Sequence, residues 1–443
     1  MRPPKPASRP RRVSLWRYWR LFRKDILSAQ PEHLYRAKMA EFRTPFFRSY
    51  LINQPDLVRY VLIDRPQAFP KSDRVTRGLA PLLGRSVFVT NGEVWAHQRR
   101  LIDPAFEGGR VKERFPAMLA AARAMVARVE PGALDVEAMA SHATADVIFR
   151  TMFSRTIEDR LARQTYAAFR AFQRAQPVGT MAALLPWWPL RLKRSARDAA
   201  QLLRGHVTEL VDARQRELDR GEAPDDLASK LMVATDPETG ERFSRADMVD
   251  QVAIFFLAGH ETSASLLAWA LWCLAAAPDW GEAVALEAGT FMDAPSFESL
   301  SKMPATRNVL RETLRLYPPV PMLVRQTTVP ETFRNRAVRP GSQIVVSPWH
   351  LGRHEALWDA PDEFDPARWG RGTPQREAWL PFSAGPRVCP GAGFAMAEGA
   401  VLLAALMAAF RFKVTETPVP VAHLTVRSRD GISLDVTPRV VRA

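Results

Sequence analysis

Residues 382–391 read FSAGPRVCPG, and they surround one of only two cysteines in a chain of 443 residues. The apolar run that follows predicts a helix over 391–409, with Pro390 at the position that favours helix initiation. Cys389 is therefore expected beside a helix N-terminus. Free backbone N–H groups and the positive end of the helix dipole lower the pKa of a thiol there and stabilise the thiolate.

The other residues of this stretch suit a flat, negatively charged ligand. Gly385 permits a tight turn before the cysteine, and Gly391 lets a planar group approach the backbone closely. Arg387 supplies a cation that stays charged at all physiological pH values. A loop that holds a thiolate under a planar anionic cofactor needs these residue types, and a buried cysteine in a Pro/Gly turn is the alternative.

The rest of the chain predicts a mostly helical fold. Apolar residues recur at three- and four-residue spacing in segments bounded by Pro and Gly residues, and strand-like runs are few. No repeat or Gly/Ser-rich linker divides the sequence. We therefore expect one mainly α domain with a minor β part. The predicted helices are 93–106, 113–130, 136–154, 157–175, 194–220, 245–277, 304–316 and 391–409, and the best strands are 343–348, 410–416 and 432–438.

Composition indicates a soluble protein in a reducing compartment. Hydrophobic residues make up 47% of the chain, which is enough for a large core, and two cysteines cannot build a disulfide framework. The apolar stretch 252–277 could span a bilayer, but its polar centre from Gly259 to Ser263 fits a buried helix better. Cys273 in this stretch is expected to be a core residue. We expect a cytoplasmic location.

The net charge of +15 is concentrated at the start of the chain. Nine basic residues and no acidic residue fall within 2–24, which leaves +6 for the remainder. Residues 1–30 are therefore expected to form a basic leader ahead of a domain over 31–443. Leu15, Trp19, Phe22 and Ile26 share one helical face, so the leader either packs on its own domain or touches a membrane surface weakly. Without a basic stripe in the body, we expect no nucleic acid partner.

The spacing Phe-x-x-Gly-x-Arg-x-Cys-x-Gly, from Phe382 to Gly391, resembles the haem-binding signature of cytochrome P-450. The resemblance implies a haem-thiolate monooxygenase of the soluble bacterial type, with haem b (iron protoporphyrin IX) between the long central helix and the cysteine loop with the last helix. It makes Cys389 the axial metal ligand, Phe382 its neighbour under the ring, Gly391 a contact of the ring and Arg387 a partner of a haem propionate.

Other motifs of that family follow in the expected order. AGHETS at 258–263 is similar to its oxygen-activating turn, in which Glu261 and Thr262 form the acid–alcohol pair and Gly259 opens room beside the iron. The stretches WAHQRR at 95–100 and PPVPMLVR at 318–325 resemble the segments that bind the propionates. They contribute Trp95, Arg99 and Arg325.

A structural network is implied as well. RETLR at 311–315 and FDPARW at 364–369 resemble the segments in which one carboxylate lies between two guanidinium groups. On that pattern Glu312 lies between Arg315 and Arg368. Such a buried arrangement is costly to break once it has formed.

The resemblance also implies partners and a substrate class. Electrons would come from a ferredoxin-type carrier with an NAD(P)H-dependent reductase, because the chain shows no dinucleotide or flavin motif. The protein is expected to be a monomer that acts on O2 and a hydrophobic small molecule. The residues expected to line the substrate pocket are apolar: Leu82, Leu83, Val87, Phe88, Met181, Leu184, Leu185, Ile254, Ala258 and Met322.

Two alternatives share the cysteine loop. A haem-based sensor would bind haem without catalysis and would have no use for Glu261 and Thr262. A haem-thiolate peroxygenase or isomerase would keep Cys389 but usually alters the acid–alcohol pair. The intact sequence ETS at 261–263 favours oxygen activation.

Overall fold

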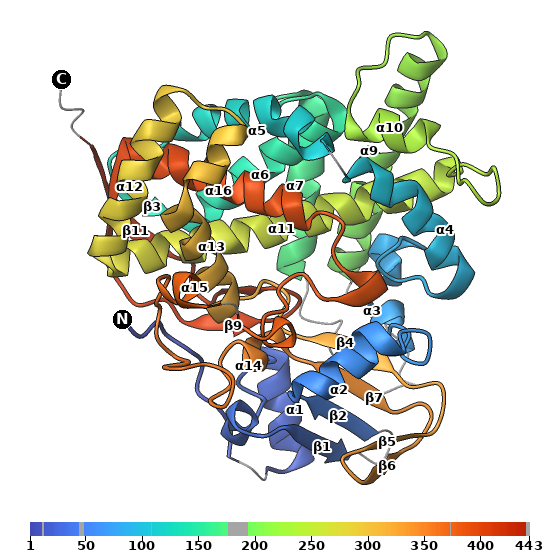
Figure 1. Ribbon diagram of the computed structural model, residues 1–443. Coiled ribbons are helices and arrows are strands. Elements are labelled where there is room, and N and C mark those ends of the chain that lie inside the picture. Colours follow the sequence, from blue (N-terminus) through green and yellow to red (C-terminus); the bar gives the residue numbers. More distant parts are fainter. Residues whose placement is uncertain (11–12, 44–47, 108, 176–193, 373, 440–443) are drawn as a thin grey trace.

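The computed structural model describes the chain except residues 11–12, 44–47, 108, 176–193, 373 and 440–443. Helices form most of it, and α11 runs through the middle of the molecule with α16 beside it (Figure 1). The helices are α1 (Leu15–Lys24), α2 (Pro55–Arg59), α3 (Asp73–Leu83), α4 (Gly92–Ile102), α5 (Arg110–Val126), α6 (Val136–Phe153), α7 (Arg160–Ala175), α9 (Arg194–Asp219), α10 (Leu227–Val233), α11 (Arg245–Ala276), α12 (Pro278–Asp293), α13 (Pro304–Leu316), α14 (Pro348–Leu351), α15 (Arg368–Arg371) and α16 (Ala392–Ala409).

The β part is small and divided among four sheets. The largest has the order β1-β2-β7-β4, in which β2 and β7 are parallel and the other pairs antiparallel. A three-stranded sheet has the order β3-β11-β8, and the remaining strands form two hairpins. The strands are β1 (Met39–Arg43), β2 (Arg48–Ile52), β3 (Gly132–Asp135), β4 (Leu323–Gln326), β5 (Glu331–Phe333), β6 (Arg336–Val338), β7 (Gln343–Val346), β8 (Phe410–Val414), β9 (Pro420–Ala422), β10 (Val426–Ser428) and β11 (Ser433–Pro438).

Local sequence explains where the long helices begin. Ser244 caps α11 by accepting from the backbone N–H of Asp247, whose carboxylate bonds back to the backbone N–H of Ser244. Asp135 caps α6 in a similar way, and prolines occupy the first turns of α12 and α13. These ends agree with the predicted helices to within a few residues, and the mainly helical fold with a minor β part is confirmed.

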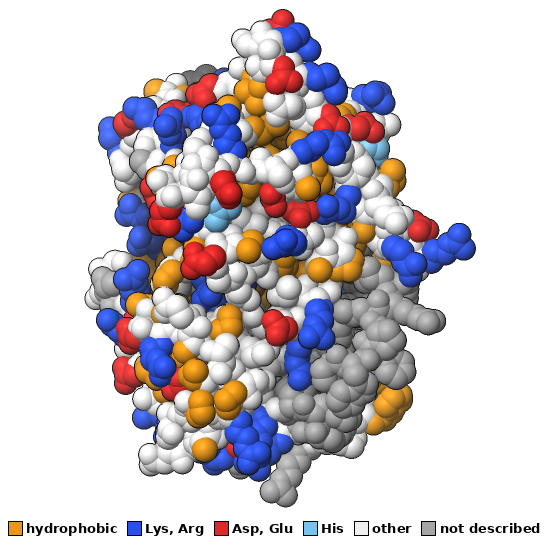
Figure 2. Space-filling view, turned by 90° about the vertical axis from the view of Figure 1, so that its right-hand side faces the viewer, with side chains coloured by type: hydrophobic (Ala, Val, Ile, Leu, Met, Phe, Trp, Pro, Cys, Tyr) orange, Lys and Arg blue, Asp and Glu red, His pale blue; other side chains and the backbone are white. Residues whose placement is uncertain are grey.

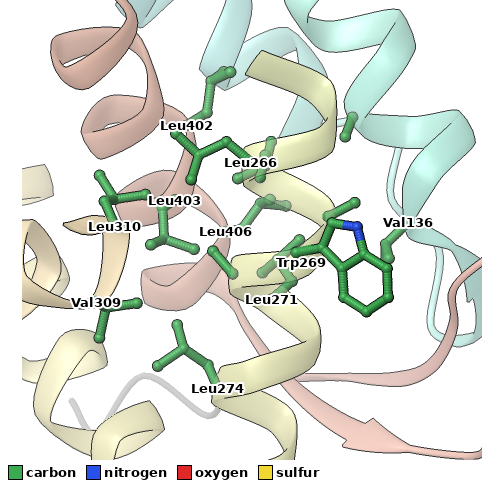
Figure 3. Close-up of a cluster of buried hydrophobic side chains, with 14 of the residues drawn as sticks. Val136, Leu266, Trp269, Leu271, Leu274, Val309, Leu310, Leu402, Leu403 and Leu406 are labelled. Carbon is green, nitrogen blue, oxygen red and sulfur yellow. The ribbon is translucent and has the colours of Figure 1, made fainter. Parts of the chain in front are cut away.

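The core forms around the C-terminal half of α11. Leu266 and Leu274 of α11 face Val309 and Leu310 of α13 and the leucines of α16, whereas Trp269 points toward Val136 of α6 (Figure 3). Trp269 also stacks on Tyr317, with 3.9 Å between ring centroids. Both helices that are long and apolar enough to cross a membrane, α11 and α16, belong to this core, and Cys273 is fully buried in it.

The basic leader lies against the body of the protein. The Tyr317 hydroxyl donates to the carbonyl of Pro4, and Ile26 exchanges a backbone hydrogen bond with Ala422. Among the described side chains of α1, Tyr18 is buried although the predicted apolar face did not include it, whereas Trp19 is only half-buried. On the face in Figure 2, Lys and Arg side chains are scattered among acidic and hydrophobic ones.

Candidate active site

The cysteine loop turns sharply before α16. Gly385 has a φ of +69°, and a Cβ there would lie 2.1 Å from the carbonyl oxygen of Leu62, so glycine is needed for both conformation and space. The backbone N–H of Cys389 donates to the carbonyl of Phe382 at 2.9 Å and closes the loop. The helix begins at Ala392 with Gly391 as its N-cap, slightly later than Pro390 suggested.

The Cys389 thiol faces a cavity. Its side chain is exposed to that cavity although protein surrounds it closely. Burial raises the pKa of the Cys389 thiol, while a hydrogen bond from the backbone of Gly391 and the charge of Arg99 oppose this effect. Desolvation therefore outweighs the helix terminus in this structure, contrary to the sequence-based expectation of a lowered pKa.

The cavity has a volume of about 1420 Å³ and reaches from the cysteine loop to the middle of α11. Residues from both sides line it, so a flat ligand between them would contact the loop on one face and the helix on the other. All seven residues that the resemblance assigns to the cofactor line this cavity, namely Trp95, Arg99, Arg325, Phe382, Arg387, Cys389 and Gly391.

Four cations meet on one side of the cavity: Lys71, Arg99, Arg325 and Arg387. Burial and the three neighbouring guanidinium groups lower the pKa of Lys71 to about 6, and burial followed by the charge of Arg387 lowers the pKa of Arg325 to about 10. The lowered pKa values indicate that the protein supplies too little negative charge around these buried cations to stabilise their charged forms.

Their partners support the same conclusion. Arg99 pairs with Asp103 at 2.6 Å, whereas Lys71, Arg325 and Arg387 bond to backbone carbonyls and form no ion pair within the described residues. The Nε atom of Arg387 is buried without a hydrogen-bond partner. A ligand with two carboxylates would satisfy these groups, so the residues present fit the propionate side of haem.

Lys71 was missed by the sequence reasoning. It sits in a loop without a motif and reaches the site because it forms an isolated backbone bridge with Arg325. Its Nζ lies 5.8 Å from the centre of the Trp95 ring, and Arg387 approaches the same ring at 5.0 Å. Trp95 is therefore an aromatic platform for these cations.

The acid–alcohol pair is divided between two environments. Thr262 lines the cavity, and its hydroxyl donates to the carbonyl of Ala258 at 2.5 Å. Glu261 is not among the described lining residues; it is 7% exposed and accepts from Thr425 at 2.7 Å and from Arg427 at 2.5 Å. Both of these hydrogen bonds are accepted by the Oε1 atom of Glu261.

Gly259 serves helix packing in this structure. A Cβ there would lie 2.5 Å from the Cδ1 atom of Ile148, so the missing side chain makes room for α6. Gly259 also lines the cavity, so the expectation that it opens room beside the iron stays a prediction.

The predicted substrate pocket is only partly made of the residues expected. Val87, Phe88, Ile254, Ala258 and Met322 line the cavity. The expectation for Leu82 and Leu83 is corrected, because both are buried in the core packed around α6, α9 and α11 and are not among the described residues that line the cavity. Met181, Leu184 and Leu185 lie outside the described residues.

Glu312 and Arg315 form the buried centre of the predicted network. The Glu312 carboxylate accepts two hydrogen bonds from Arg315, at 2.7 and 2.9 Å, and one from Arg368 at 3.0 Å. The indole of Trp369 and the backbone N–H of Asp365 add two more. These contacts tie α13 to the segment that leads toward the cysteine loop.

A second buried carboxyl group was not anticipated. Glu398 of α16 lines the cavity, accepts from the Ser263 hydroxyl at 2.6 Å and keeps its other oxygen, Oε1, buried without a partner. Burial raises its pKa to about 8, against the effect of the Ser263 hydrogen bond. The sequence does carry a signal for it, because Glu398 is the one acidic residue in an otherwise apolar helix.

Comparison with known proteins agrees with this geometry. Residues 29–434 match the family model described as Cytochrome P450. Cyclooctat-9-en-7-ol 5-monooxygenase from Streptomyces melanosporofaciens is 33% identical, over 92% of this chain and 87% of the relative. Cyclooctatin synthase from the same organism is 30% identical over 94% and 89%, and human Cytochrome P450 4A11 is 28% identical over 86% and 78%. With its thiol, its cation cluster and its polar turn around one cavity, this chain belongs to the cytochrome P450 family and is a haem b monooxygenase.

Proposed function

We propose that this enzyme binds haem b with Cys389 as the axial ligand and with Lys71, Arg99, Arg325 and Arg387 around the propionates. The observation that carries this proposal is the meeting of four cations and one thiol in the same cavity. Trp95, Phe382 and Gly391 would pack against the cofactor. Haem, when bound, supplies the iron at which O2 is activated and the substrate is oxidised.

The chain's own task is to hold protons near the distal side without admitting bulk water. Thr262 has the required hydroxyl at the cavity wall, with Oγ1 fixed by its bond to Ala258. Glu261 would act as a proton source behind it once its bonds to Arg427 and Thr425 open. In this proposal Thr262 orders the proton donor and Glu261 resupplies it.

The substrate is hydrophobic, and we propose a largely hydrocarbon cyclic alcohol or a compound of similar polarity. One Streptomyces relative is named after a cyclic alcohol, cyclooctat-9-en-7-ol, and the cavity here is lined by apolar side chains such as Val87, Ile254 and Met322. A screen of such compounds for a change in the spin state of the iron would test this class.

Electrons would arrive from a ferredoxin-type carrier that docks near the cysteine loop. We propose a cytoplasmic monomer, because the two long apolar helices are core elements and both cysteines are free. A weak contact of the basic leader with a membrane surface is compatible with this location.

The test of monooxygenase function uses Thr262→Ala. We expect this variant to bind haem and substrate and to oxidise NAD(P)H through a redox system, but to release hydrogen peroxide in place of much of the product. Proton delivery typically contributes about 10² to 10⁴-fold, though water can replace part of the relay. Product formed per NAD(P)H oxidised is the measurement.

Thr151→Ala is the matched control, because Thr151 also lines the cavity and bonds to a carbonyl four residues earlier in its helix. Coupling should stay near the wild-type value in this control. Unchanged coupling in Thr262→Ala would remove Thr262 from the mechanism. Wild-type turnover with peroxide, but never with O2 and a reductase, would move the enzyme to the peroxygenases.

A further inference from the structure

The cavity extends well beyond the cysteine loop and ends under the N-terminal helix. Tyr18, Phe22 and Ile26 line this outer part together with Phe42 of β1. The Tyr18 ring lies 4.6 Å from Phe42 and 5.7 Å from Phe22, measured between centroids, so the wall here is aromatic. α1 lies beside β1 and β2 at the lower end of the molecule in Figure 1. One face of α1 is thus part of the wall of the cavity.

The opposite face of α1 is basic and aromatic. Trp16 is 68% exposed and stacks on Trp19 with 4.6 Å between centroids. Arg23 lies over the Trp19 ring at 4.7 Å. The sequence of this helix, LWRYWRLFRK, contains no acidic residue. Its four cations are exposed: Arg17, Arg20, Arg23 and Lys24.

This combination has the chemistry of a lipid–water interface. Tryptophan rings favour the headgroup region, where one side of the ring is apolar and the other wet, and basic side chains are attracted to anionic headgroups. An acidic protein could also pair with these cations, so ferredoxin binding is kept below as an outcome of the test. The outer face of α1, defined by Trp16, Arg17 and Arg20, therefore fits an anionic lipid surface best.

We propose that α1 is the lipid-facing entrance of the cavity: its outer face binds an anionic membrane surface, and an apolar substrate passes from the lipid under its inner face toward Cys389. This inference rests on the proposed function in one respect, that the cavity receives an apolar substrate. It adds the route by which that substrate arrives and the surface that delivers it.

The first experiment measures binding to vesicles with the haem-loaded protein. Wild type should sediment with vesicles of phosphatidylglycerol and phosphatidylcholine, more weakly at high salt, and little with phosphatidylcholine alone. The variant Trp16→Ser/Arg17→Glu/Arg20→Glu should lose at least about tenfold in affinity. Its side chains do not line the cavity, so haem binding should be unaffected.

Matched controls come from other exposed positions. Leu286→Ser removes a side chain that is 77% exposed on α12, and Arg163→Glu/Arg216→Glu makes the same charge change on α7 and α9. Both controls should bind vesicles as wild type does. Equal losses in the controls and in the α1 variant would overturn the proposal, because they would show a response to net charge alone.

The second experiment separates delivery from binding. N-dodecylimidazole is added either dissolved in detergent-free buffer below its solubility limit or preloaded into the anionic vesicles, and its ligation to the iron is followed by absorbance. The α1 variant should keep the wild-type equilibrium affinity in buffer and take up the vesicle-borne ligand at least about fivefold more slowly.

The outcomes are distinguishable. If wild type does not bind the ligand in buffer, the proposed apolar cavity fails, whatever α1 does. If binding in buffer is normal but uptake from vesicles is equal in wild type and the α1 variant, the entrance proposal fails alone. If the α1 variant keeps vesicle binding but loses affinity for a ferredoxin, the outer face is a protein-docking surface and the lipid proposal is wrong.

Discussion

Arg427 holds Glu261 through a hydrogen bond of 2.5 Å from Nη2 to Oε1, and the carboxylate is 7% exposed. Neither residue is among the described residues that line the cavity. Glu261, the acid of the acid–alcohol pair, therefore forms an ion pair that joins α11 to β10. It precedes Thr262, the alcohol of the pair, by one residue.

The strength of this ion pair can be measured by a double-mutant cycle. Glu261→Gln, Arg427→Gln and the double variant should show a coupling energy of about 0.5–3 kcal/mol in urea unfolding, since the partners touch and the carboxylate is buried. The half-exposed guanidinium favours the lower part of this range. Additive losses within about 0.5 kcal/mol would mean that the pair contributes nothing of its own.

Replacing each of the two cysteines by serine tests which of them is the axial ligand of the haem iron. Cys389→Ser should lose the red-shifted Soret band of the reduced carbon monoxide complex, because only a thiolate ligand produces that shift. Cys273→Ser should keep it, since Cys273 is fully buried in the core and does not line the cavity. The opposite pattern of spectra would exclude Cys389 as the ligand.

The network around Glu312 should contribute more to the free energy of unfolding than an ion pair at the surface does. Glu312→Gln leaves Arg315 and Arg368 without their carboxylate, and breaking a buried pair typically costs about 3–5 kcal/mol. Glu282→Gln is the control, because Glu282 pairs with Arg439 at the surface and such pairs contribute about 0–1 kcal/mol. Equal changes in the free energy of unfolding for both variants would contradict this view.

Glu398 should make stability depend on pH. Burial raises its pKa to about 8 from an ordinary value of 4.5, so between these values the native state keeps a proton that the unfolded state has lost. The free energy of unfolding then falls as pH rises, by up to about 1.4 kcal/mol per pH unit. Glu398→Gln should remove this dependence. Measured by urea unfolding, the free energy of unfolding of the variant should therefore rise relative to that of the wild type between about pH 5 and about pH 8.

That result has a clear contrary outcome. If wild type and Glu398→Gln show parallel pH profiles across this range, the carboxyl is ionised in the native state. In that case Oε1 would require a charged or strongly polar partner that is absent from the described residues.

Gly385 offers a comparison with a second glycine of similar conformation. Gly385→Ala should destabilise the protein more than Gly92→Ala, because both have positive φ values but only Gly385 would place its Cβ against backbone atoms. The left-handed conformation alone costs about 1–2 kcal/mol, and the clash adds to it. Thermal unfolding of both variants measures the difference, and equal shifts would rule out the clash with Leu62.

The long helices were predictable because their information is local. The apolar spacing of 245–277 predicted α11 almost to the residue. α12 was missed, since its alanines, glycines and acidic residues weaken the apolar pattern. β2 was missed because its parallel pairing with β7 unites segments about 300 residues apart, and no local pattern predicts that contact.

The same distinction applies to the site. Residues within compact motifs, such as Phe382, Arg387 and Thr262, could be found by spacing and lie together in the cavity. Lys71 could not, because its place depends on a bridge to Arg325 that exists only in the folded chain. Glu261 was found, but its ion pair with Arg427 could not be foreseen from a turn in one helix.

The contacts of the leader bear on the order in which the chain can fold during synthesis. Lys5 pairs with Asp362, and Asp25 accepts from the backbone N–H of Ala422, so these leader residues have partners that are made several hundred residues later. At about 5–20 residues per second, these partners appear tens of seconds later. Docking of the strongly basic leader must therefore wait until these partners have been synthesised, and it is expected to be a late step of folding.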